Sequence, residues 1–333
     1  MTRAAVIAGI GADLPPRVVS NDELAQRLDT SDQWIRTRTG IGQRYVVGPG
    51  MSTGTLATKA GLRAMKSAGI GSADMVVLAT TTPDRLCPAT APTVAARMGM
   101  AGVPAYDVSA VCSGFLYALQ SAAASIAAGF AERIVVIAAE AFSTILDPAD
   151  RTTVAIFGDG AGAMVLRAGE ADEEGALLGF DLGSDGGLAD LITVRAGGSE
   201  QRATGRPADE ADTYFRMEGK SVFVNAVRRM TESSSAVLAK TGWAVEEVDR
   251  FVGHQANKRI IHAVAEQLGV DPAKAVLNIE RVGNTAAASI PLALADGAAD
   301  GTLRRGDKVL LTAFGGGATW GSATLRWPGL GTD

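Results

Sequence analysis

Apolar residues in this chain fall into two kinds of segment that alternate along the sequence. Short runs rich in β-branched residues predict strands at residues 4–10, 75–79, 133–137, 251–253 and 308–311. Between them, alanine- and leucine-rich stretches with helical spacing predict helices at 55–68, 114–130 and 221–240. The predicted strands are apolar on both faces, which is typical of a sheet covered by helices on both sides. We therefore expect an α/β protein with a mainly parallel sheet.

The second half of the chain repeats features of the first half in the same order. Three pairs of short segments match: Asp74-Met-Val-Val with Asp249-Arg-Phe-Val and Glu132-Arg-Ile-Val with Asp307-Lys-Val-Leu, each 175 residues apart, and Gly162-Ala-Met-Val-Leu with Gly321-Ser-Ala-Thr-Leu, 159 apart. Three matches in one order predict two copies of one βα unit packed together. We expect the two halves at residues 1–172 and 173–333, joined through the acidic stretch 169–175.

The composition excludes several classes of protein. With 47% hydrophobic residues, 20% charged residues and a formal net charge of −5, the chain is not disordered. The acidic balance and the 5% content of aromatic residues disfavour nucleic-acid binding. Two cysteines rule out a disulfide framework, and without a C-x-x-C pair they leave too few ligands for a structural zinc site. A length of 333 residues suits about two domains or one duplicated unit.

Neither a signal peptide nor a membrane span is expected. The first apolar run leads into Gly11-Ala-Asp13 with no A-x-A cleavage site, so we interpret it as a strand. The apolar stretch 115–131 carries Gln120, Ser121 and Ser125 and is rich in alanine, which favours a buried core helix. We expect a cytoplasmic protein with no membrane and no nucleic acid among its partners.

Two glycines in the first predicted strand match part of a dinucleotide-binding motif. However, Gly9-Ile-Gly-Ala-Asp-Leu14 has leucine where that motif needs its third glycine, and Pro15-Pro16 follows where a helix should begin. We therefore expect a turn at these glycines and no dinucleotide site.

Cys112 is the first candidate for catalysis. It lies where a short strand-like segment ends and the helix predicted at 114–130 begins. The dipole at a helix N-terminus favours a thiolate, and Gly114 allows another group to approach the turn closely. A buried structural cysteine is the alternative, and the local sequence leaves both open.

Three other loops carry candidate groups. His254 directly follows a predicted strand and precedes a helical stretch at 258–268, and such a loop is the usual active-site position in an α/β sheet. His262, within that stretch, is expected to pack among apolar residues. Asn284 stands between small residues and either faces a cavity or makes an ordinary turn. The glycines at 315–317 expose backbone N–H groups that could bind an oxyanion, or they form a plain loop.

Taken in order, the segments around these residues resemble the β-ketoacyl-acyl-carrier-protein synthase III family. Six motifs between about Ile7 and Trp327 carry the resemblance: Trp34-Ile-Arg-Thr-Arg-Thr-Gly40, Ser109-Ala-Val-Cys-Ser-Gly-Phe115, Asp150-Arg151 with Phe157-Gly-Asp-Gly-Ala-Gly162, Gly253-His-Gln-Ala-Asn257, Gly283-Asn-Thr-Ala-Ala-Ala-Ser-Ile-Pro291 and Phe314-Gly-Gly-Gly-Ala-Thr-Trp-Gly321. The resemblance implies the thiolase fold, an α/β fold in which duplicated βα halves stack as a five-layer αβαβα sandwich. That fold agrees with the internal repeat.

The resemblance also implies a reaction. Cys112 would take an acyl group from acyl-CoA; a malonyl thioester on acyl-carrier protein would then lose CO2 and attack the acyl group, which starts a fatty acid or polyketide chain. His254 and Asn284 would donate hydrogen bonds to the enolate oxygen, and the N–H groups of Cys112 and Gly316 would hold the second oxyanion. Phe314 would form a wall beside the nucleophile. Acyl-CoA is a substrate, so the resemblance implies no cofactor and no metal, and it implies a homodimer.

Binding surfaces follow from the same resemblance, residue by residue. The CoA contacts are expected at Thr30, Trp34, Arg38, Arg151 and Asn257. The tryptophan would stack on the adenine ring, and a guanidinium suits a phosphate.

The resemblance also implies that Arg259, one turn beyond His254, is a basic contact to the acidic carrier protein. Lys220 and Thr152 depart from the asparagine and glycine that the family often has near CoA.

Cys87 departs from the family in a way that bears on specificity. Acetyl-primed bacterial members have a phenylalanine here that reaches across the dimer to close the acyl pocket. A smaller side chain predicts room for a longer or branched primer, unless Leu86 or Leu146 refills the space.

Three alternatives to this function stay open. The same residues could use malonyl-CoA in place of malonyl-carrier protein and form acetoacetyl-CoA. An acyltransferase of secondary metabolism would pass the acyl group to an alcohol or amine, but only decarboxylation clearly needs both His254 and Asn284. A non-catalytic partner subunit is disfavoured because its nucleophile is usually replaced, and Cys112 is present.

Overall fold

Two β-sheets form the framework of the chain. The computed structural model describes residues 3–330. The first sheet has the strand order β1 (Arg3–Asp13), β7 (Gly160–Glu170), β6 (Arg133–Glu140), β4 (Met75–Ala79), β5 (Ala105–Val108). The second has the order β11 (Arg250–Gly253), β12 (Lys308–Gly315), β13 (Thr319–Arg326), β8 (Leu177–Ser184).

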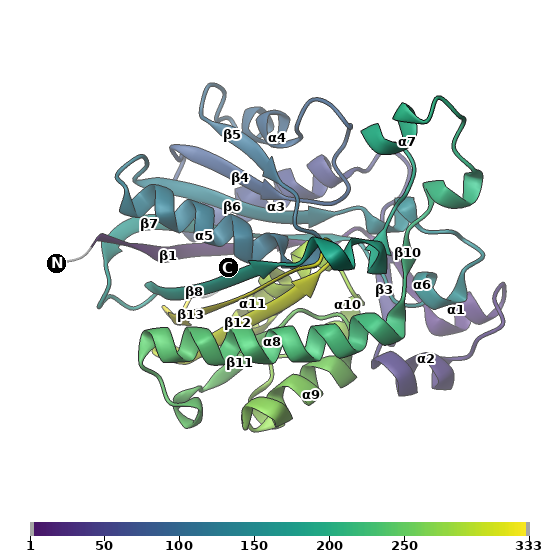
Figure 1. Ribbon diagram of the computed structural model, residues 1–333. Helices are drawn as coiled ribbons and strands as arrows, with labels where there is room; N and C mark the ends of the chain where they lie inside the picture. Colours follow the sequence, from purple (N-terminus) through teal and green to yellow (C-terminus); the bar gives the residue numbers. More distant parts are fainter. Residues whose placement is uncertain (1–2, 331–333) are drawn as a thin grey trace.

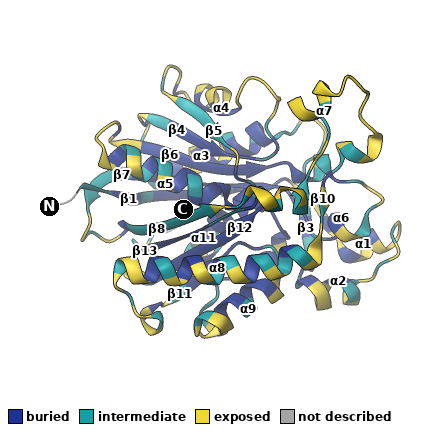
Figure 2. Cartoon of the chain, in the orientation of Figure 1, coloured by how far each residue is buried: buried dark blue, intermediate teal, exposed yellow. Residues whose placement is uncertain are grey.

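Helices cover both sheets and fill the space between them, which gives five layers (Figure 1). The first sheet packs on α3 (Thr53–Ser67) and α4 (Ala91–Arg97), and the second on α8 (Gly219–Thr241) and α9 (Lys258–Leu268). The central layer consists of α5 (Gly114–Ala127) and α11 (Ser289–Ala299), which contact both sheets and share one apolar core with them. Figure 2 shows the outer helices with a buried inner face and an exposed outer face, as expected for amphipathic helices. The five-layer α/β architecture is confirmed.

The smaller elements gather around one end of the stacked sheets (Figure 1). They are the paired strands β2 (Arg17–Ser20) and β3 (Gln43–Val46), the paired strands β9 (Ile192–Thr193) and β10 (Arg216–Met217), and the short helices α1 (Asn21–Ala25), α2 (Asp32–Thr39), α6 (Arg151–Val154), α7 (Ser199–Ala203) and α10 (Ile279–Val282). Short 3₁₀ segments lie at Val111–Ser113, Phe142–Ile145, Gly186–Leu191, Glu210–Thr213, Val245–Glu247, Pro272–Lys274 and Ala286–Ala288.

The internal repeat corresponds to equivalent strands of the two sheets. The three matched pairs of segments lie on β4 and β11, β6 and β12, and β7 and β13. In the second sheet, the counterpart of β5 is a single parallel bridge between Phe251 and Ala275. Strand β7 ends at Glu170 and β8 begins at Leu177, on either side of the predicted join. The division at 172 stays a prediction, and the outer ends of both predicted halves, residues 1–2 and 331–333, lie outside the described residues.

The prediction of a mainly parallel sheet is wrong. The two main sheets contain three parallel strand pairs and four antiparallel ones. The antiparallel strands β7 and β13 are nevertheless buried over most of their length. Because helices cover both faces of each sheet, an antiparallel strand here is as apolar as a parallel one, and the sequence pattern does not separate them.

The turn predicted at Gly9 and Gly11 is also wrong, because both residues lie within β1. A Cβ on Gly11 would lie 2.3 Å from the Ala64 backbone nitrogen, and one on Gly9 would lie 2.5 Å from the Ala64 carbonyl oxygen. The glycines therefore allow α3 to pack directly on the strand backbone, which is the close-approach use of glycine in strands.

No helix between residues 3 and 330 combines the length and the apolar content that a membrane crossing requires.

Gly11→Ala should lower the free energy of unfolding by about 1–3 kcal/mol, because the added methyl group meets helix backbone that is fixed by its own hydrogen bonds. Urea denaturation measures this change. Gly71→Ala is the matched control, since a Cβ there meets open space, and it should remain within about 1 kcal/mol of the parent chain. Equal stability of the two variants would contradict the close packing of α3 on β1.

Candidate active site

Cys112 lies at the N-terminal end of a central helix, as predicted. The 3₁₀ turn Val111–Ser113 leads directly into α5, and the Cys112 side chain is buried. The end of β12 packs behind this turn, because a Cβ on Gly315 would lie only 2.7 Å from the Cys112 nitrogen. Glycine at 315 thus allows β12 to approach the backbone of the candidate nucleophile.

Backbone strain marks this region. Within the described residues, two amino acids other than glycine have a positive φ: Val111 at 46° and Ala286 at 45°. This region of φ is unfavourable for a side chain with a Cβ, above all for a β-branched one. Val111 directly precedes Cys112, and the Ala286 N–H donates to the side chain of Asn284. Strained residues concentrate at functional sites, where surrounding structure enforces them.

His254 follows β11 and is held on two sides. Its backbone N–H donates to the Thr312 carbonyl of β12 at 2.8 Å, and its Nδ1 lies 2.6 Å from the Ser289 hydroxyl at the start of α11. Burial lowers the pKa of His254 to about 3. The imidazole is therefore neutral at physiological pH. His262, the other histidine, is half-buried in α9.

Asn284 is fixed by both its backbone and its side chain. Its N–H donates to the Ile156 carbonyl and its carbonyl accepts from the Gly158 N–H, both at 2.9 Å. The side-chain Oδ1 accepts from the Ala286 N–H at 2.9 Å. This bond sets the orientation of the amide and leaves its Nδ2–H2 group as the donor that can point elsewhere.

The four segments that carry the predicted catalytic groups pack on one another. Cys112 belongs to an apolar group, here called the Cys112 cluster, whose members are Cys112, Phe142, Leu146, Phe157, Phe215 and Ala286. Phe314 is buried in β12. Gly316 follows that strand, and a Cβ on it would lie 3.0 Å from Ile192, a residue that packs on the same cluster. The structure thus brings together the segments of Cys112, His254, Asn284 and Gly316.

Burial sets the resting charge of Cys112, the candidate nucleophile. It raises the pKa of the Cys112 thiol, and the nearby Glu140 carboxyl raises it further. The predicted thiolate-favouring effect of the helix N-terminus is therefore outweighed, and the resting group is the thiol. The helix terminus can still stabilise negative charge that develops on sulfur during reaction.

A basic cavity of about 500 Å³ lies on one side of the Cys112 cluster. Four of its lining residues are ones predicted to contact CoA or the carrier protein, and two more, Thr152 and Lys220, are the departures from the family pattern. The full lining is Trp34, Arg38, Thr39, Thr152, Ile156, Gly219, Lys220, Phe223, Val224, Asn257 and Arg259. The lining has three cationic side chains and no acidic one. Ile156, which packs on the Cys112 cluster, connects the cavity to the backbone of Asn284.

Trp34 stands at the centre of a cationic group. The guanidinium carbon of Arg38 lies 4.5 Å from its ring centroid, and that of Arg151 lies 5.4 Å away. Arg151 also pairs with Asp29 at 2.8 Å. The buried Thr30 hydroxyl has no hydrogen-bond partner between residues 3 and 330. These residues form a planar, cationic surface that suits an aromatic base with phosphate groups.

Asn257 has a structural role that the sequence interpretation did not include. Its Oδ1 accepts from the Arg259 N–H at 2.8 Å and caps α9, while its Nδ2 donates to the Arg38 carbonyl at 2.9 Å. Asn257 therefore joins α9 to α2 across the floor of the basic cavity.

A second cavity, mainly apolar and of about 570 Å³, lies on another side of the Cys112 cluster. Its apolar lining includes Leu86, Val111, Ile145, Ile192 and Phe215. Cys87 is exposed on the adjoining loop. The prediction that it sets primer size concerns a pocket closed by a second copy of the chain, and it stays a prediction.

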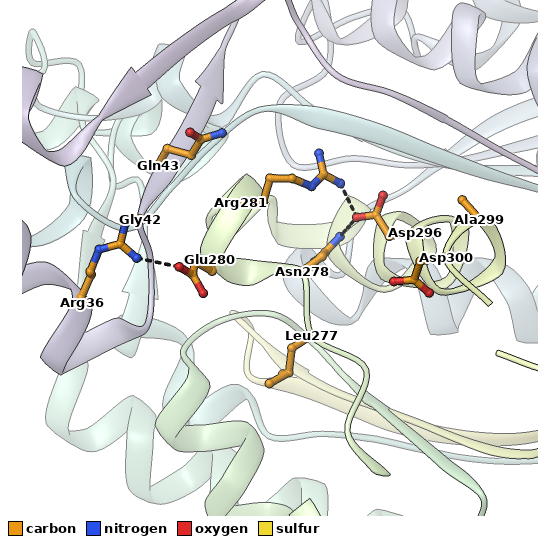
Figure 3. Close-up of a pocket in the computed structure, with 10 residues that line it drawn as sticks. All are labelled: Arg36, Gly42, Gln43, Leu277, Asn278, Glu280, Arg281, Asp296, Ala299 and Asp300. Atoms are coloured by element: carbon orange, nitrogen blue, oxygen red, sulfur yellow. Dashed lines mark hydrogen bonds and ion pairs between the residues drawn. The ribbon is translucent and has the colours of Figure 1, made fainter. Parts of the chain in front are cut away.

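A larger hollow of about 940 Å³ contains none of the predicted site residues (Figure 3). It is polar and crossed by hydrogen-bonded pairs, in which Arg36 contacts Glu280 at 2.7 Å and Asp296 accepts from both Arg281 and Asn278. The hollow backs onto α10, which ends two residues before Asn284.

Glu140 is a buried group that the sequence interpretation missed. It ends β6 and accepts hydrogen bonds from the Thr81 N–H, the Thr82 N–H and the Thr82 hydroxyl. Burial raises the pKa of Glu140 to about 7, against the lowering effect of these hydrogen bonds. A charged residue at the end of the wholly apolar run 134–139 was the available signal, because such a residue needs partners when the run is buried.

No group of three or more histidine, cysteine, aspartate or glutamate side chains between residues 3 and 330 is placed to hold a metal ion. Both cysteines are free thiols.

Glu140 should make the stability of the chain depend on pH. Its pKa is higher in the folded chain than the ordinary value of 4.5, so its contribution is complete below about pH 4.5 and is lost as pH rises through about 7. The free energy of unfolding of the wild type minus that of Glu140→Gln should therefore fall across this range and stay level above it. Denaturant unfolding at a series of pH values measures the difference.

His254 changes the free energy of unfolding over an overlapping pH range but with the opposite sign, because folding lowers its pKa. It is present in both chains and cancels in the difference. Glu246→Gln, at an exposed carboxyl, is the control and should follow the wild-type profile. A pH-independent difference between the wild type and Glu140→Gln would count against the raised pKa.

Comparisons with known proteins agree with this geometry. Residues 106–186 match the family model for 3-oxoacyl-[acyl-carrier-protein (ACP)] synthase III, and residues 238–327 match the model for its C-terminal part. A β-ketoacyl-[acyl-carrier-protein] synthase III of Streptomyces coelicolor is 61% identical over 330 residues, which cover 99% of each chain.

Two solved structures extend this likeness to the whole fold. The 3-oxoacyl-(acyl carrier protein) synthase III of Pseudomonas aeruginosa has a TM-score of 0.92 at 52% identity, covering 98% of this chain and 99% of that one. The priming β-ketosynthase of the R1128 polyketide biosynthetic pathway has a TM-score of 0.90 at 31% identity, covering 97% and 96%. Likeness at this identity over the full length leaves one conclusion: the chain belongs to the β-ketoacyl-acyl-carrier-protein synthase III family and has its thiolase fold.

Proposed function

We propose that this chain starts fatty acid or polyketide chains by a decarboxylative Claisen condensation. An acyl-CoA primer is loaded onto Cys112, and malonyl-acyl-carrier protein extends it to a 3-ketoacyl product. One observation carries the proposal: the Cys112 cluster and the residues packed on it line both a basic and an apolar cavity. A nucleophile between such cavities suits a substrate with phosphates at one end and an acyl chain at the other.

In the first step, the Cys112 sulfur attacks the thioester carbonyl of acyl-CoA. The C–S bond to CoA breaks, the acyl–Cys112 thioester forms, and the thiol hydrogen ends on the sulfur of the departing CoA. One thioester replaces another of similar energy, so the transfer is reversible. The helix N-terminus favours the charge that builds on sulfur, and the N–H groups of Cys112 and Gly316 are the proposed donors to the carbonyl oxygen.

In the second step, the malonyl group loses CO2 and its electrons move onto the thioester oxygen. The amide of Asn284 and the neutral imidazole of His254 are the proposed hydrogen-bond donors to that oxygen. The enolate carbon then attacks the acyl carbonyl, and Cys112 leaves with the electron pair of the C–S bond and takes up one proton from solvent. Phe314 is the proposed wall that keeps water from this centre. The chemistry calls for no resident cofactor or metal, since CO2 loss supplies the carbanion.

The basic cavity supports the assignment of CoA to Trp34, Arg38 and Asn257, which line it. Arg151, over the Trp34 ring, and Thr30, whose buried hydroxyl is unpartnered within residues 3–330, are proposed to complete the CoA contact. Arg259 at the rim of the cavity is the proposed contact to the acidic carrier protein. We also propose a homodimer, because Leu86 lines the apolar cavity and is nevertheless 76% exposed, and an exposed apolar side chain there suits coverage by a second copy. In that arrangement Cys87 adjoins the primer of the partner. A cytoplasmic location is proposed as well.

A second candidate function uses malonyl-CoA as extender and releases a 3-ketoacyl-CoA. The basic cavity would accept either CoA ester, so the carrier must be tested directly. Radiolabelled malonyl-CoA and malonyl-carrier protein should be compared with a panel of acyl-CoA primers. We expect labelled 3-ketoacyl product only with the carrier protein. Product formed from malonyl-CoA at a comparable rate would replace the first function by the second.

Single substitutions separate the two steps. Cys112→Ser should abolish acyl transfer from CoA, as followed by mass spectrometry of the protein. Asn284→Ala should still be acylated but should release CO2 from the malonyl thioester roughly 10²-fold more slowly, because one oxyanion donor is lost. Acylation and normal turnover of the Cys112→Ser variant would remove Cys112 from its role, and equal loss of both steps in Asn284→Ala would remove Asn284 from its role.

A further inference from the structure

Ser289 connects the second central helix to the candidate catalytic histidine. It is the first residue of α11 and is fully buried. Its Oγ lies 2.6 Å from Nδ1 of His254 and also accepts the Gln255 N–H at 3.3 Å. The contact is short and within the range of a strong O–H···N hydrogen bond.

The placement of hydrogens follows from counting donors and acceptors. A serine hydroxyl has one hydrogen and two lone pairs, and the Gln255 N–H uses a lone pair. Within residues 3–330, Nδ1 of His254 is the acceptor that this hydroxyl reaches. The hydroxyl hydrogen therefore goes to Nδ1. Because the imidazole is neutral, its single N–H must then be at Nε2.

We propose that Ser289 is a positioning residue that holds His254 in the Nε2–H tautomer, so that the imidazole is a hydrogen-bond donor in the active site. The inference rests on the proposed function, in which an enolate oxygen needs a donor. In the opposite tautomer, Nε2 would present a lone pair to that oxygen and repel it. The same lone pair would make His254 a base toward the Cys112 thiol, so Ser289 selects between two kinds of chemistry.

Helix α11, which carries Ser289, is itself held by a second set of polar contacts. Asp296 lies seven residues along α11, about two turns, and so faces the same side as Ser289. It accepts from Asn278 Nδ2 at 2.8 Å and from Arg281 Nη2 at 2.5 Å (Figure 3).

Asn278 also links Asp296 to the loop that carries His254. The Asn278 N–H donates to Oε1 of Gln255 at 3.2 Å, and Gln255 Nε2 donates to the Gly253 carbonyl at 2.7 Å. Gln255 directly follows His254. Helix α11 thus anchors the histidine loop twice, at Ser289 through the ring and at Asp296 through Asn278 and Gln255. Rotation of the ring would break the bond to Ser289.

Nuclear magnetic resonance of histidine nitrogens tests the tautomer without any substrate. The chain has two histidines, and His262→Gln removes the signal of the other one. In ¹⁵N-histidine-labelled protein, we expect His254 to show a protonated Nε2 and an unprotonated Nδ1 that accepts a hydrogen bond. Ser289→Ala should lose that pattern, and Ser289→Thr, which retains a hydroxyl, should keep it. A wild-type His254 protonated at Nδ1 would overturn the proposal whatever the variants do.

Kinetics test the consequence for the reaction. In Ser289→Ala, acylation of Cys112 should stay within about twofold of the wild type. Malonyl decarboxylation should fall about 10- to 100-fold, by analogy with the loss of a partner that orients a metal-bound histidine. Ser234→Ala is the matched control. Ser234, on the outer helix α8, is equally buried, and its hydroxyl lies 3.2 Å from that of Ser322. This variant should leave both steps unchanged.

The two proposals fail in different ways. Unchanged decarboxylation in a folded Ser289→Ala chain would overturn the role of Ser289 while the condensation stands. A wild-type chain that does not decarboxylate malonyl thioesters would overturn the proposed function, and the nitrogen spectrum would still report the tautomer.

Discussion

The burial of α5 and α11 between the two sheets is the constraint on which the active site depends. Both helices lie in one apolar core with strands of both sheets, so neither can shift without disturbing all five layers. Each begins at the site: Cys112 lies in the turn that leads into α5, and Asn284 lies five residues before α11. The position of the reacting groups is thus set by the packing of the central layer, and the surrounding loops add walls and cavities to it.

Desolvation gives this centre its electrostatic character. Burial favours the neutral form of both Cys112 and His254. At rest, therefore, Cys112 is not a thiolate and His254 is not an imidazolium. The site instead offers dipoles, namely a helix terminus, a side-chain amide and a ring N–H, for the negative charge that develops in the proposed reaction. In a low-dielectric site, fixed dipoles stabilise that charge without reorganising during the reaction. The cationic side chains of Arg38, Lys220 and Arg259 line the basic cavity, where the proposed substrate brings its phosphates.

Local pattern was enough to predict much of this structure. The helix expected at 258–268 has those bounds, and the predicted strands fall on β1, β4, β6, β11 and β12, because each depends on neighbours in sequence. The motifs around Cys112, His254 and Asn284 likewise revealed the family. Features that depend on residues distant in the sequence could not be predicted from it. The glycines of β1 are explained only by α3, the antiparallel direction of β7 by its partners, and the raised pKa of Cys112 by its burial.

The two strained turns occupy equivalent positions in the two halves of the chain. Val111 and Ala286 lie 175 residues apart, the spacing that relates β4 to β11 and β6 to β12, and each opens a 3₁₀ turn leading into a central helix. By this correspondence, the counterpart of Cys112 is Ala287, and that of Gly114 is Ser289. The turns meet, since a Cβ on Gly114 would lie 3.6 Å from the Ala287 Cβ. The candidate site therefore sits on the approximate twofold axis of the molecule. One copy has the sulfur proposed to capture the acyl group, and the other has a methyl group in its place and carries the polar groups proposed to face the enolate.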